Sequence, residues 1–302
     1  FSDFDIKPEI VSALAKAGIT HPFPIQAMTL PVALSGHDII GQAKTGTGKT
    51  LGFGIPALNR AVSPGEPGFE DLAVPGAPQA IVVAPTRELA VQVAGDLTTA
   101  SKGRTVRIVQ LYGGRAYEPQ INTLKAGVEV VVGTPGRILD LIKQRHLDLS
   151  QVRTVVLDEA DEMLDLGFLQ DVEAILSATP STRQTMLFSA TMPAAVVAMA
   201  RRYMSRPTHI RASSMEDDGQ TVKNIRQVAY RAHSMDKVEM IARILQAEER
   251  GLTIIFSQTK RTADRVADDL KERGFAAGAL HGDLGQGARE QALRAFRNGK
   301  ID

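Results

Sequence analysis

The chain alternates short apolar runs with longer amphipathic stretches. The apolar runs are rich in β-branched residues and nearly continuous, which is typical of strands buried on both faces of a parallel sheet. They are DIIGQA (38–43), AIVVAP (80–85), TVRIVQLY (105–112), VEVVVGTP (128–135), TVVLDEAD (154–161) and TMLFSAT (185–191). Between them, patterns such as RELAVQVAGDL (87–97) and GRILDLIKQR (136–145) predict helices. The alternation predicts an α/β domain with a doubly wound parallel sheet.

A second, shorter series follows the polar stretch ASSMEDDGQTVKN (212–224), which we interpret as a linker. It reads IRQVAYRA, DKVEMIARILQAEE, LTIIFSQ, KRTADRVADDLKERG, AAGALHG and GAREQALRAFRNG, which predicts strand and helix in turn. Three strands are few for a sheet of this class. We therefore predict a first domain over 1–211 and an incomplete second α/β domain over 225–302. The Pro- and Gly-rich stretch 63–79 is predicted to be a surface loop, because the strand pattern resumes directly after it.

The composition limits the number of domains and the class of protein. The 302 residues suit about two domains, with the 43% hydrophobic and 23% charged residues usual for a soluble globular protein. No apolar run is long enough to span a bilayer and no signal peptide is visible, so we expect a cytoplasmic protein. The absence of cysteine excludes disulfides and thiolate metal sites, and the six histidines show no metal-ligand spacing. With a net charge of +1, charge alone does not predict nucleic-acid binding.

The stretch AKTGTGKT follows an apolar run and leads into a predicted helix, the context of a phosphate-binding P-loop. Glycines let backbone N–H groups turn toward phosphate oxygens, and the helix N-terminus adds positive potential. We expect Lys49 to reach the β- and γ-phosphates and the Thr50 hydroxyl to ligate Mg²⁺. The general pattern has glycine in place of Ala43, and the alternative is a simple Gly- and Thr-rich turn. The predicted cofactor-binding residues of this loop are Ala43, Lys44, Thr45, Gly46, Thr47, Gly48, Lys49 and Thr50.

An acidic segment, Asp158 to Asp161, follows the apolar run TVVL. Carboxylates at the end of a parallel strand lie on the ligand-binding edge of such a sheet. We expect Asp158 to hold Mg²⁺ through water, and Glu159 to orient and deprotonate the attacking water. Acidic tetrapeptides alone are usually solvated turns, so this prediction depends on the preceding strand and on the P-loop upstream.

Together these segments resemble the DEAD-box family of ATP-dependent RNA helicases, in its bacterial form. The matching segments, in the family's order, are AKTGTGKT (43–50), PTRELA (85–90), GG (113–114), TPGR (134–137), DEAD (158–161), SAT (189–191), IIFSQTK (254–260), HGD (281–283) and QGAR (286–289). The resemblance covers nearly the whole chain, and Ala43 is the family's usual P-loop residue. It implies a RecA-like domain with a parallel sheet, followed by part of a second RecA-like domain. It also implies ATP and Mg²⁺ as cofactors and RNA as partner.

The segment GITHPFPIQ (18–26) resembles the adenine-reading motif of this family. A glutamine amide donates and accepts at once, which matches the edge of adenine and mismatches guanine, so Gln26 implies ATP over GTP. Phe1 stands where the family places an aromatic that stacks on the base, although such a residue taken alone is more often part of a core. Phe23 replaces the small hydroxyl residue usual between the two prolines.

The resemblance further implies that PTRE, GG and TPGR line an RNA groove, with contacts from QGAR in the second lobe. Backbone N–H groups, hydroxyls and guanidiniums suit phosphate oxygens and 2′-OH groups and carry no base specificity. The implied RNA-binding residues are Pro85, Thr86, Arg87, Gly113, Gly114, Thr134, Pro135, Gly136, Arg137, Gln286 and Arg289. Ser189 and Thr191 are expected to couple the nucleotide state to strand separation by bonding to Asp161.

These features predict an enzyme in which RNA-stimulated ATP hydrolysis drives local duplex unwinding. A nucleotide-gated RNA clamp is one alternative, and a DNA translocase of the wider helicase superfamily is another. Intact Lys49, Asp158 and Glu159 favour the enzyme, and the adenine motif together with DEAD and SAT disfavours the translocase. The family's remaining second-lobe motifs do not occur before Asp302, so we expect a fragment of a longer helicase with little RNA-stimulated turnover of its own.

Overall fold

The computed structural model describes residues 1–44, 46–212, 226, 228–248 and 250–301. The chain forms two compact units, Phe1–Asp218 and Gly219–Asp302. The stretch interpreted as a linker, 212–224, lies outside the described residues except for Ala212. Across the described ranges, every helix falls short of the length and apolar character that a bilayer-spanning segment requires.

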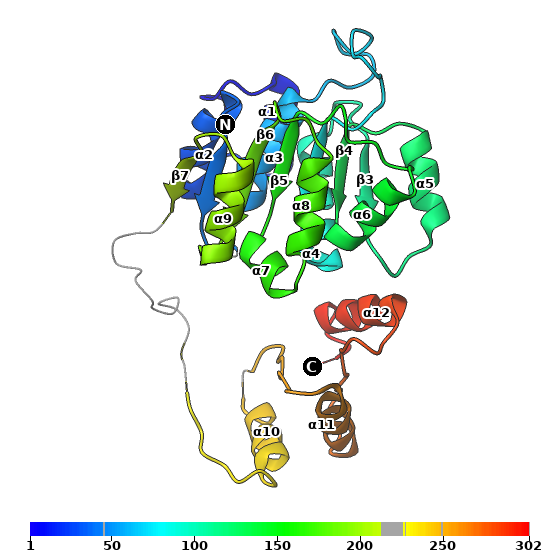
Figure 1. Cartoon of the computed structure of the whole chain (residues 1–302). Coiled ribbons are helices and arrows are strands. Elements are labelled where there is room, and N and C mark those ends of the chain that lie inside the picture. Colours follow the sequence, from blue (N-terminus) through cyan, green and yellow to red (C-terminus); the bar gives the residue numbers. More distant parts are fainter. Residues whose placement is uncertain (45, 213–225, 227, 249, 302) are drawn as a thin grey trace. The chain divides into compact units, whose positions relative to one another are not determined.

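A seven-stranded sheet forms the centre of the first unit (Figure 1). Its strand order is β3-β4-β2-β5-β6-β1-β7, and every neighbouring pair is parallel. The strands are β1 (Ile39–Gln42), β2 (Ala80–Val83), β3 (Ile108–Leu111), β4 (Val130–Gly133), β5 (Thr154–Leu157), β6 (Gln184–Ser189) and β7 (Thr208–Arg211). Every residue of β2, β4, β5 and β6 is buried, as in a sheet covered on both faces. The predicted doubly wound α/β fold is confirmed.

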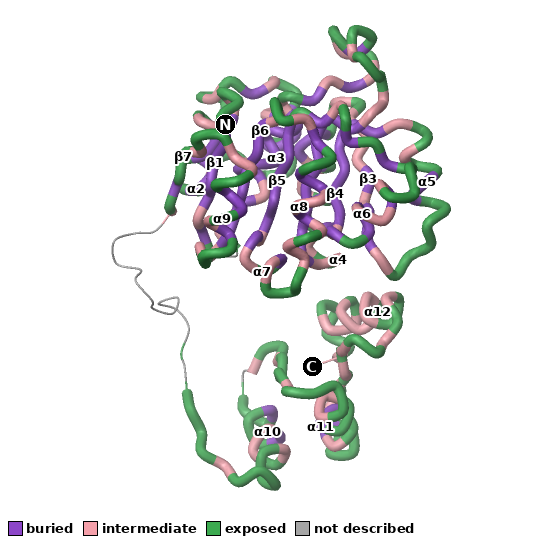
Figure 2. Tube along the Cα trace, viewed as in Figure 1, coloured by how far each residue is buried: buried purple, intermediate pink, exposed green. Residues whose placement is uncertain are grey.

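Two apolar clusters fill the space between the sheet and the helices on its two faces. Side chains alternate along β2, so that Ala80 and Val82 belong to one cluster and Ile81 and Val83 to the other. The helices of the first cluster are α1 (Pro8–Lys16), α2 (Pro24–Leu34), α3 (Lys49–Arg60) and α4 (Arg87–Ala100). Those of the second are α5 (Tyr117–Lys125), α6 (Pro135–Lys143), α7 (Ala160–Asp165), α8 (Leu169–Ser177) and α9 (Ala194–Tyr203). Figure 2 shows the buried residues concentrated in the strands and on the helix faces against them.

The strand β7 is the one element of this sheet that the apolar runs did not predict. It pairs with β1 at the edge of the sheet, with Thr208 opposite Ile39. Ile210 is its one buried residue, and the other positions of the strand are polar and exposed. An edge strand of this kind carries too little hydrophobic periodicity to be recognised from sequence, because only part of it faces a core.

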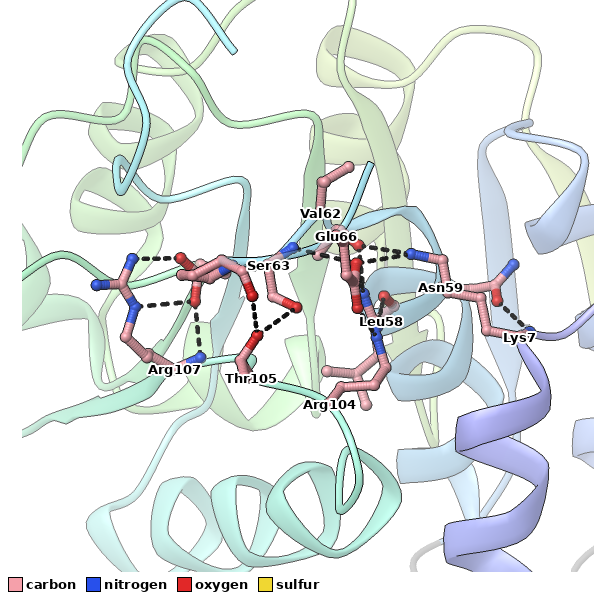
Figure 3. Close-up of polar contacts among 12 residues, drawn as sticks. Lys7, Leu58, Asn59, Val62, Ser63, Glu66, Arg104, Thr105 and Arg107 are labelled. Carbon is pink, nitrogen blue, oxygen red and sulfur yellow. Dashed lines mark hydrogen bonds and ion pairs between the residues drawn. The ribbon is translucent and has the colours of Figure 1, made fainter. Parts of the chain in front are cut away.

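The Pro- and Gly-rich stretch 63–79 is a loop between α3 and β2, as predicted. Its first turn is fixed by the Glu66 carboxylate, which accepts hydrogen bonds from Arg104 and Lys7 (Figure 3). The Arg104 side chain is 1% exposed and also donates to two backbone carbonyl oxygens at the end of α3. The loop is therefore fastened to the carboxyl end of α3 within the first unit.

The described part of the second unit contains α10 (Lys237–Leu245), α11 (Lys260–Glu272) and α12 (Gln286–Arg297), which coincide with the predicted helical patterns. The predicted strands differ: no described residue of 225–232, 252–258 or 276–282 belongs to a strand. Side chains in these segments, such as Tyr230 and Phe256, are exposed. A strand requires a neighbour that bonds its backbone groups, and apolar composition alone does not supply one.

Candidate active site

The chemically distinctive segments of the first unit meet along one edge of the sheet, at the carboxyl ends of its strands. AKTGTGKT follows β1, PTRE follows β2 and DEAD follows β5. The GG segment follows β3, TPGR follows β4, and SAT begins at the last residue of β6. They share this edge because the strands are parallel. Open parallel sheets bind their ligands at this edge.

The loop between β1 and α3 turns at two glycines. Gly46 and Gly48 have φ angles of 83° and 78°, in the left-handed region that favours glycine. Gly48 is the N-cap of α3, so the N–H groups of the first helical turn face the loop without partners inside the helix. The Thr47 hydroxyl donates to the Lys44 carbonyl oxygen at 2.8 Å. Such a loop fits a phosphate group. Thr45, which is also a predicted residue of this loop, lies outside the described residues.

Lys49 and Asp158 bring opposite charges into the interior beside this loop. They are 6% and 3% exposed, and the Lys49 ammonium has no hydrogen-bond partner among the described residues. Burial raises the pKa of Asp158 to about 7, although the positive charge of Lys49 acts to lower it. A buried ammonium without a hydrogen bond is costly, and an anion that reaches it removes that cost. The pair therefore has unused capacity to bind an anion at Lys49 and a cation at Asp158.

Glu159 has a backbone conformation that is rare for a residue with a side chain. Its φ of 50° and ψ of 54° lie in the left-handed region, and it serves as the N-cap of α7. For an L-residue this conformation costs about 1–2 kcal/mol. Its N–H donates to Asp158 Oδ1 at 3.0 Å. Strained backbone of this kind is concentrated at functional sites, which supports a chemical role for Glu159.

The predicted metal ligands are Asp158 and Thr50. The Thr50 hydroxyl lies close enough to the Asp96 carboxylate on α4 to act on it. Burial raises the pKa of Asp96, and the Thr50 hydroxyl acts to lower it. A threonine hydroxyl has two lone pairs that can bind a cation. The described residues contain no cluster of three Asp, Glu or His that could enclose a metal ion. The donor set therefore fits Mg²⁺, which usually takes few protein ligands and keeps water and phosphate oxygens.

Gln26 joins the segment 18–26 to the glycine-rich loop. Its side chain is 1% exposed, its Nε2 donates to the Gly48 carbonyl oxygen at 2.6 Å, and its Oε1 accepts from the Phe23 N–H at 3.0 Å. A β-carbon at Gly48 would lie 2.5 Å from the Phe23 ring, so the contact requires glycine. Phe1 is 6% exposed within the first apolar cluster, and its stacking on a base stays a prediction.

A hydrogen-bonded group links the DEAD and SAT segments. Asp161 Oδ2 accepts from the Thr191 N–H at 2.8 Å and from its hydroxyl at 2.7 Å. The Asp161 N–H donates to Ser189 Oγ at 3.2 Å, and that hydroxyl donates to the Thr191 carbonyl oxygen at 2.7 Å. Burial acts to raise the pKa of Asp161, but these hydrogen bonds outweigh it and lower the pKa. The residues predicted to couple the two segments are therefore in direct contact.

The segments predicted to bind RNA lie together at the ends of β2, β3 and β4. Thr86 caps α4, its hydroxyl accepting a backbone N–H at 3.2 Å. The Arg87 guanidinium lies against the GG turn, since a β-carbon at Gly114 would come within 2.4 Å of Arg87 Nη1. The Thr134 N–H donates to the Leu111 carbonyl oxygen at 2.9 Å, which joins the ends of β4 and β3. The other predicted residues on this edge are Pro85, Gly113, Pro135 and Gly136.

Arg137 has a neighbour that sequence reasoning missed. Its guanidinium carbon lies 3.8 Å from the centre of the Tyr117 ring, and its Nη2 donates to the Arg115 carbonyl oxygen at 3.2 Å. The Tyr117 hydroxyl donates to Asp140, which raises the pKa of Tyr117 and lowers that of Asp140. No local signal could have paired Tyr117 with Arg137, because they lie on different helices.

Gln286 and Arg289 belong to α12 of the second unit. Arg289 Nη1 donates to Gln286 Oε1 at 3.4 Å, and Gln286 Nε2 donates to Glu290 Oε1 at 3.1 Å. These contacts arrange the polar side chains at the start of α12, where the two residues lie one helical turn apart. Their contact with RNA stays a prediction.

Comparison with known proteins connects these features to one family. Residues 23–200 match the sequence model of the DEAD/DEAH box helicases, and residues 236–302 match that of the helicase conserved C-terminal domain. The chain is 43% identical over all 302 residues to DEAD-box ATP-dependent RNA helicase CshA of Bacillus subtilis strain 168 and spans 58% of its length. It is 44% identical to CshA of Geobacillus kaustophilus and spans 62% of that protein. The crystal structure of a DEAD box protein from Methanococcus jannaschii matches the whole chain with a TM-score of 0.65 and 37% identity, over 78% of its own chain.

Proposed function

This chain belongs to the DEAD/DEAH box helicase family, and we propose that it carries the ATP-binding machinery of an ATP-dependent RNA helicase. In this proposal RNA-stimulated ATP hydrolysis drives local unwinding or remodelling of RNA duplexes. Residues 1–211 form the ATP-binding helicase domain, 212–224 the linker, and 225–302 belong to the second helicase domain. The names of the relatives, DEAD-box ATP-dependent RNA helicases, support this assignment.

The observation that carries the proposal is the Lys49 ammonium, which is buried at the start of α3. It has no hydrogen-bond partner among the described residues and is close enough to Asp158 to act on the pKa of that carboxyl group. A triphosphate supplies the missing anion, and the N–H groups at the start of α3 add hydrogen bonds to its oxygens. Gln26 is bonded to the same loop and offers one remaining amide hydrogen and one lone pair, which suits the edge of adenine. These contacts support ATP as the nucleotide.

The residues of the site divide the chemistry between them. Asp158 and Thr50 would hold Mg²⁺, which neutralises charge on the phosphates when it is bound. Lys49 holds the β- and γ-phosphates in place, and Glu159 takes a proton from the attacking water. A pKa for Asp158 as high as about 7 belongs to the site without a cation, and a cation favours its charged form.

The edge formed by PTRE, GG and TPGR supports RNA binding through the sugar-phosphate backbone. It offers the guanidiniums of Arg87 and Arg137 together with Thr hydroxyls and backbone N–H groups, which are donors for phosphate oxygens and 2′-OH groups. The bonds between Asp161 and Thr191 give the nucleotide site a direct link to the SAT segment. We propose that this link couples the nucleotide state to strand separation.

ATP hydrolysis by the whole protein, measured with and without single-stranded RNA, tests the proposal. We expect RNA to stimulate turnover, and we expect Lys49→Ala to abolish it because the phosphates lose their positioning charge. Glu159→Gln should retain ATP binding and lower kcat at least about a hundredfold, since the general base is lost and the phosphate site remains.

Different results would contradict the role of Glu159 and the assignment of RNA as partner. Glu159→Gln turning over ATP at the parental rate would remove Glu159 from the mechanism. Equal turnover with RNA, with DNA of the same sequence and with neither would contradict the assignment of RNA as partner. RNA affinity should also fall steeply with salt, because the proposed contacts are to phosphates.

A further inference from the structure

Two arginines face a common hollow at the edge of the sheet opposite the active site. Arg60 ends α3, and Arg153 directly precedes β5, whose other end leads into DEAD. The hollow has a volume of about 540 Å³. Its remaining lining comes from the loops that enter β5 and β6, namely Ser150, Gln151, Val152, Pro180 and Thr182. Because α3 runs from Lys49 to Arg60, this hollow lies about 17 Å from the phosphate loop along the helix.

Neither guanidinium has a hydrogen bond or an ion pair with any of the described residues. Partial burial, and then the positive charge of Arg153, lowers the pKa of Arg60. Asp148, a carboxylate in the same loop as Ser150, accepts the Ser150 N–H at 2.8 Å and lines a different hollow. Two cations therefore share one hollow, and none of the residues that line it is a carboxylate.

A structural role for Arg60 at the end of a helix is the competing explanation, since cations are favourable there. Among the described residues, the Arg60 guanidinium makes no hydrogen bond to the carbonyl oxygens at this helix end, and neighbouring cations already serve two of them. Arg104 donates to Leu58 O at 2.6 Å and to Ala61 O at 2.7 Å, and Lys7 Nζ donates to Ala61 O at 3.2 Å (Figure 3). One end of the Arg60 guanidinium lies beside Gly36, where a β-carbon would be 3.9 Å from Nη1. Hydrogen-bonded capping of α3 therefore does not explain Arg60.

We propose that this hollow is a second phosphate-binding site, distinct from the P-loop. Two guanidiniums provide paired N–H donors that match phosphate oxygens. The hydroxyls of Ser150 and Thr182 and the amide of Gln151 add neutral donors around the same space. Phosphate oxygens are supplied equally by a small anion such as pyrophosphate or by an RNA strand, and the experiment separates these sources.

Calorimetric titration with pyrophosphate, on a Lys49→Ala background that removes the P-loop contribution, tests the site. We expect Arg60→Gln and Arg153→Gln each to weaken binding about tenfold or more, because each removes a charge-assisted contact. Arg60→Lys should give a smaller loss, since it keeps the charge and loses the planar fork. Arg201→Gln is the matched control: Arg201 is an exposed arginine in the last turn of α9, as Arg60 is in the last turn of α3. It should leave the affinity unchanged.

Thermal unfolding separates binding from a structural role. Pyrophosphate should raise the Tm of the Lys49→Ala protein and should not raise the Tm of the same protein carrying Arg60→Gln and Arg153→Gln. Without pyrophosphate the arginine variants should have a Tm no lower than that of their parent, because the two positive charges repel each other in the parent.

A competition experiment identifies the source of the phosphate. Displacement of pyrophosphate by single-stranded RNA would assign the site to a nucleic-acid strand, and a lack of displacement would assign it to a small anion. No binding by the Lys49→Ala protein, unchanged affinity in both arginine variants, or an equal loss in Arg201→Gln would overturn the proposal.

Discussion

Gln26 divides its side-chain amide between two segments of the active site. One amide hydrogen goes to the Gly48 carbonyl oxygen at 2.6 Å, and the oxygen accepts the Phe23 N–H at 3.0 Å. The side chain is buried, so these bonds are not exchanged freely with water. A single residue therefore has two separable roles, one in fixing the glycine-rich loop and one in reading the base with the hydrogen-bonding capacity that remains.

Gln26→Ala distinguishes these roles. If the amide reads adenine, we expect the affinity for ATP to fall about tenfold more than the affinity for GTP, because only adenine matches its donor and acceptor. If it only fixes the loop, both nucleotides should lose affinity equally. Titration of both nucleotides into parent and variant measures the difference. Gln120→Ala is the matched control: it removes another buried amide of the first unit, on α5, and should leave both affinities unchanged.

The helix α3 joins the phosphate loop to an anchored end. Lys49 stands in its first turn. At its other end Arg104 donates to the Leu58 carbonyl oxygen, and Arg104 and Lys7 both donate to the carbonyl oxygen of the C-cap residue Ala61. Both cations also bind the Glu66 carboxylate of the following loop (Figure 3). The Arg104 side chain is 1% exposed, so loss of its carboxylate partner would leave a buried cation with carbonyl oxygens alone. The position of α3, and with it that of Lys49, depends on this anchor.

The anchor predicts a pH dependence of stability. Burial acts to raise the pKa of Glu66, but hydrogen bonds from Arg104, Ser63 and Lys7 outweigh it and lower the pKa from its ordinary 4.5 to about 2. The folded protein therefore holds Glu66 charged at a pH where the unfolded chain protonates it. This stabilisation is complete above about pH 4.5 and is lost as the pH falls toward 2.

Urea unfolding of the parent and of Glu66→Gln across this pH range measures the effect. At pH 7 the variant should be less stable by about 1–3 kcal/mol, and the difference should shrink below about pH 4. Glu173→Gln removes the partner of the exposed Arg202 and should cost about 0–1 kcal/mol. A stability difference for Glu66→Gln that is the same at pH 7 and pH 3 would contradict the pKa assignment.

At the scale of the whole molecule, the two units differ in how much apolar surface they bury. The first has an apolar cluster on each face of its sheet. The described part of the second has one small cluster around Leu245 and Leu270, while Ile254 and Phe256 are 65% and 93% exposed. Burial of apolar surface provides most of the stability of a domain. We expect the second unit to be the less stable one.

Hydrogen exchange of two comparable helices measures this difference. The helices α4 and α11 have similar lengths, and each is preceded by an N-cap threonine whose hydroxyl accepts a backbone N–H of the first turn. Amides of α11 should exchange at least about tenfold faster than those of α4, because local opening requires less free energy where fewer apolar contacts are broken. Equal protection of the two helices, after correction for intrinsic exchange, would show that the second unit is as stable as the first.

Features that depend only on neighbouring residues along the chain could be predicted without the fold. Six strands of the sheet, the glycine-rich loop and the DEAD segment could be predicted, because buried parallel strands are continuously apolar and a phosphate loop is a local backbone pattern. Parallel strands then place every segment that follows a strand on one edge, so the order of the motifs already implied their meeting. The second unit shows the limit of this reasoning, since its apolar runs have no strand partner among the described residues.

The contacts between side chains that are distant in the sequence depend on how the elements pack. The fold places Tyr117 against Arg137, the Thr50 hydroxyl against Asp96 and Arg104 at the end of α3, and it leaves Arg60 beside Arg153. Each contact joins two elements, and its geometry depends on how those elements pack, whereas hydrophobic periodicity records only which face of each element is buried. The chemical groups of the site could therefore be predicted from the sequence, and the hydrogen bonds and charges that hold them required the fold.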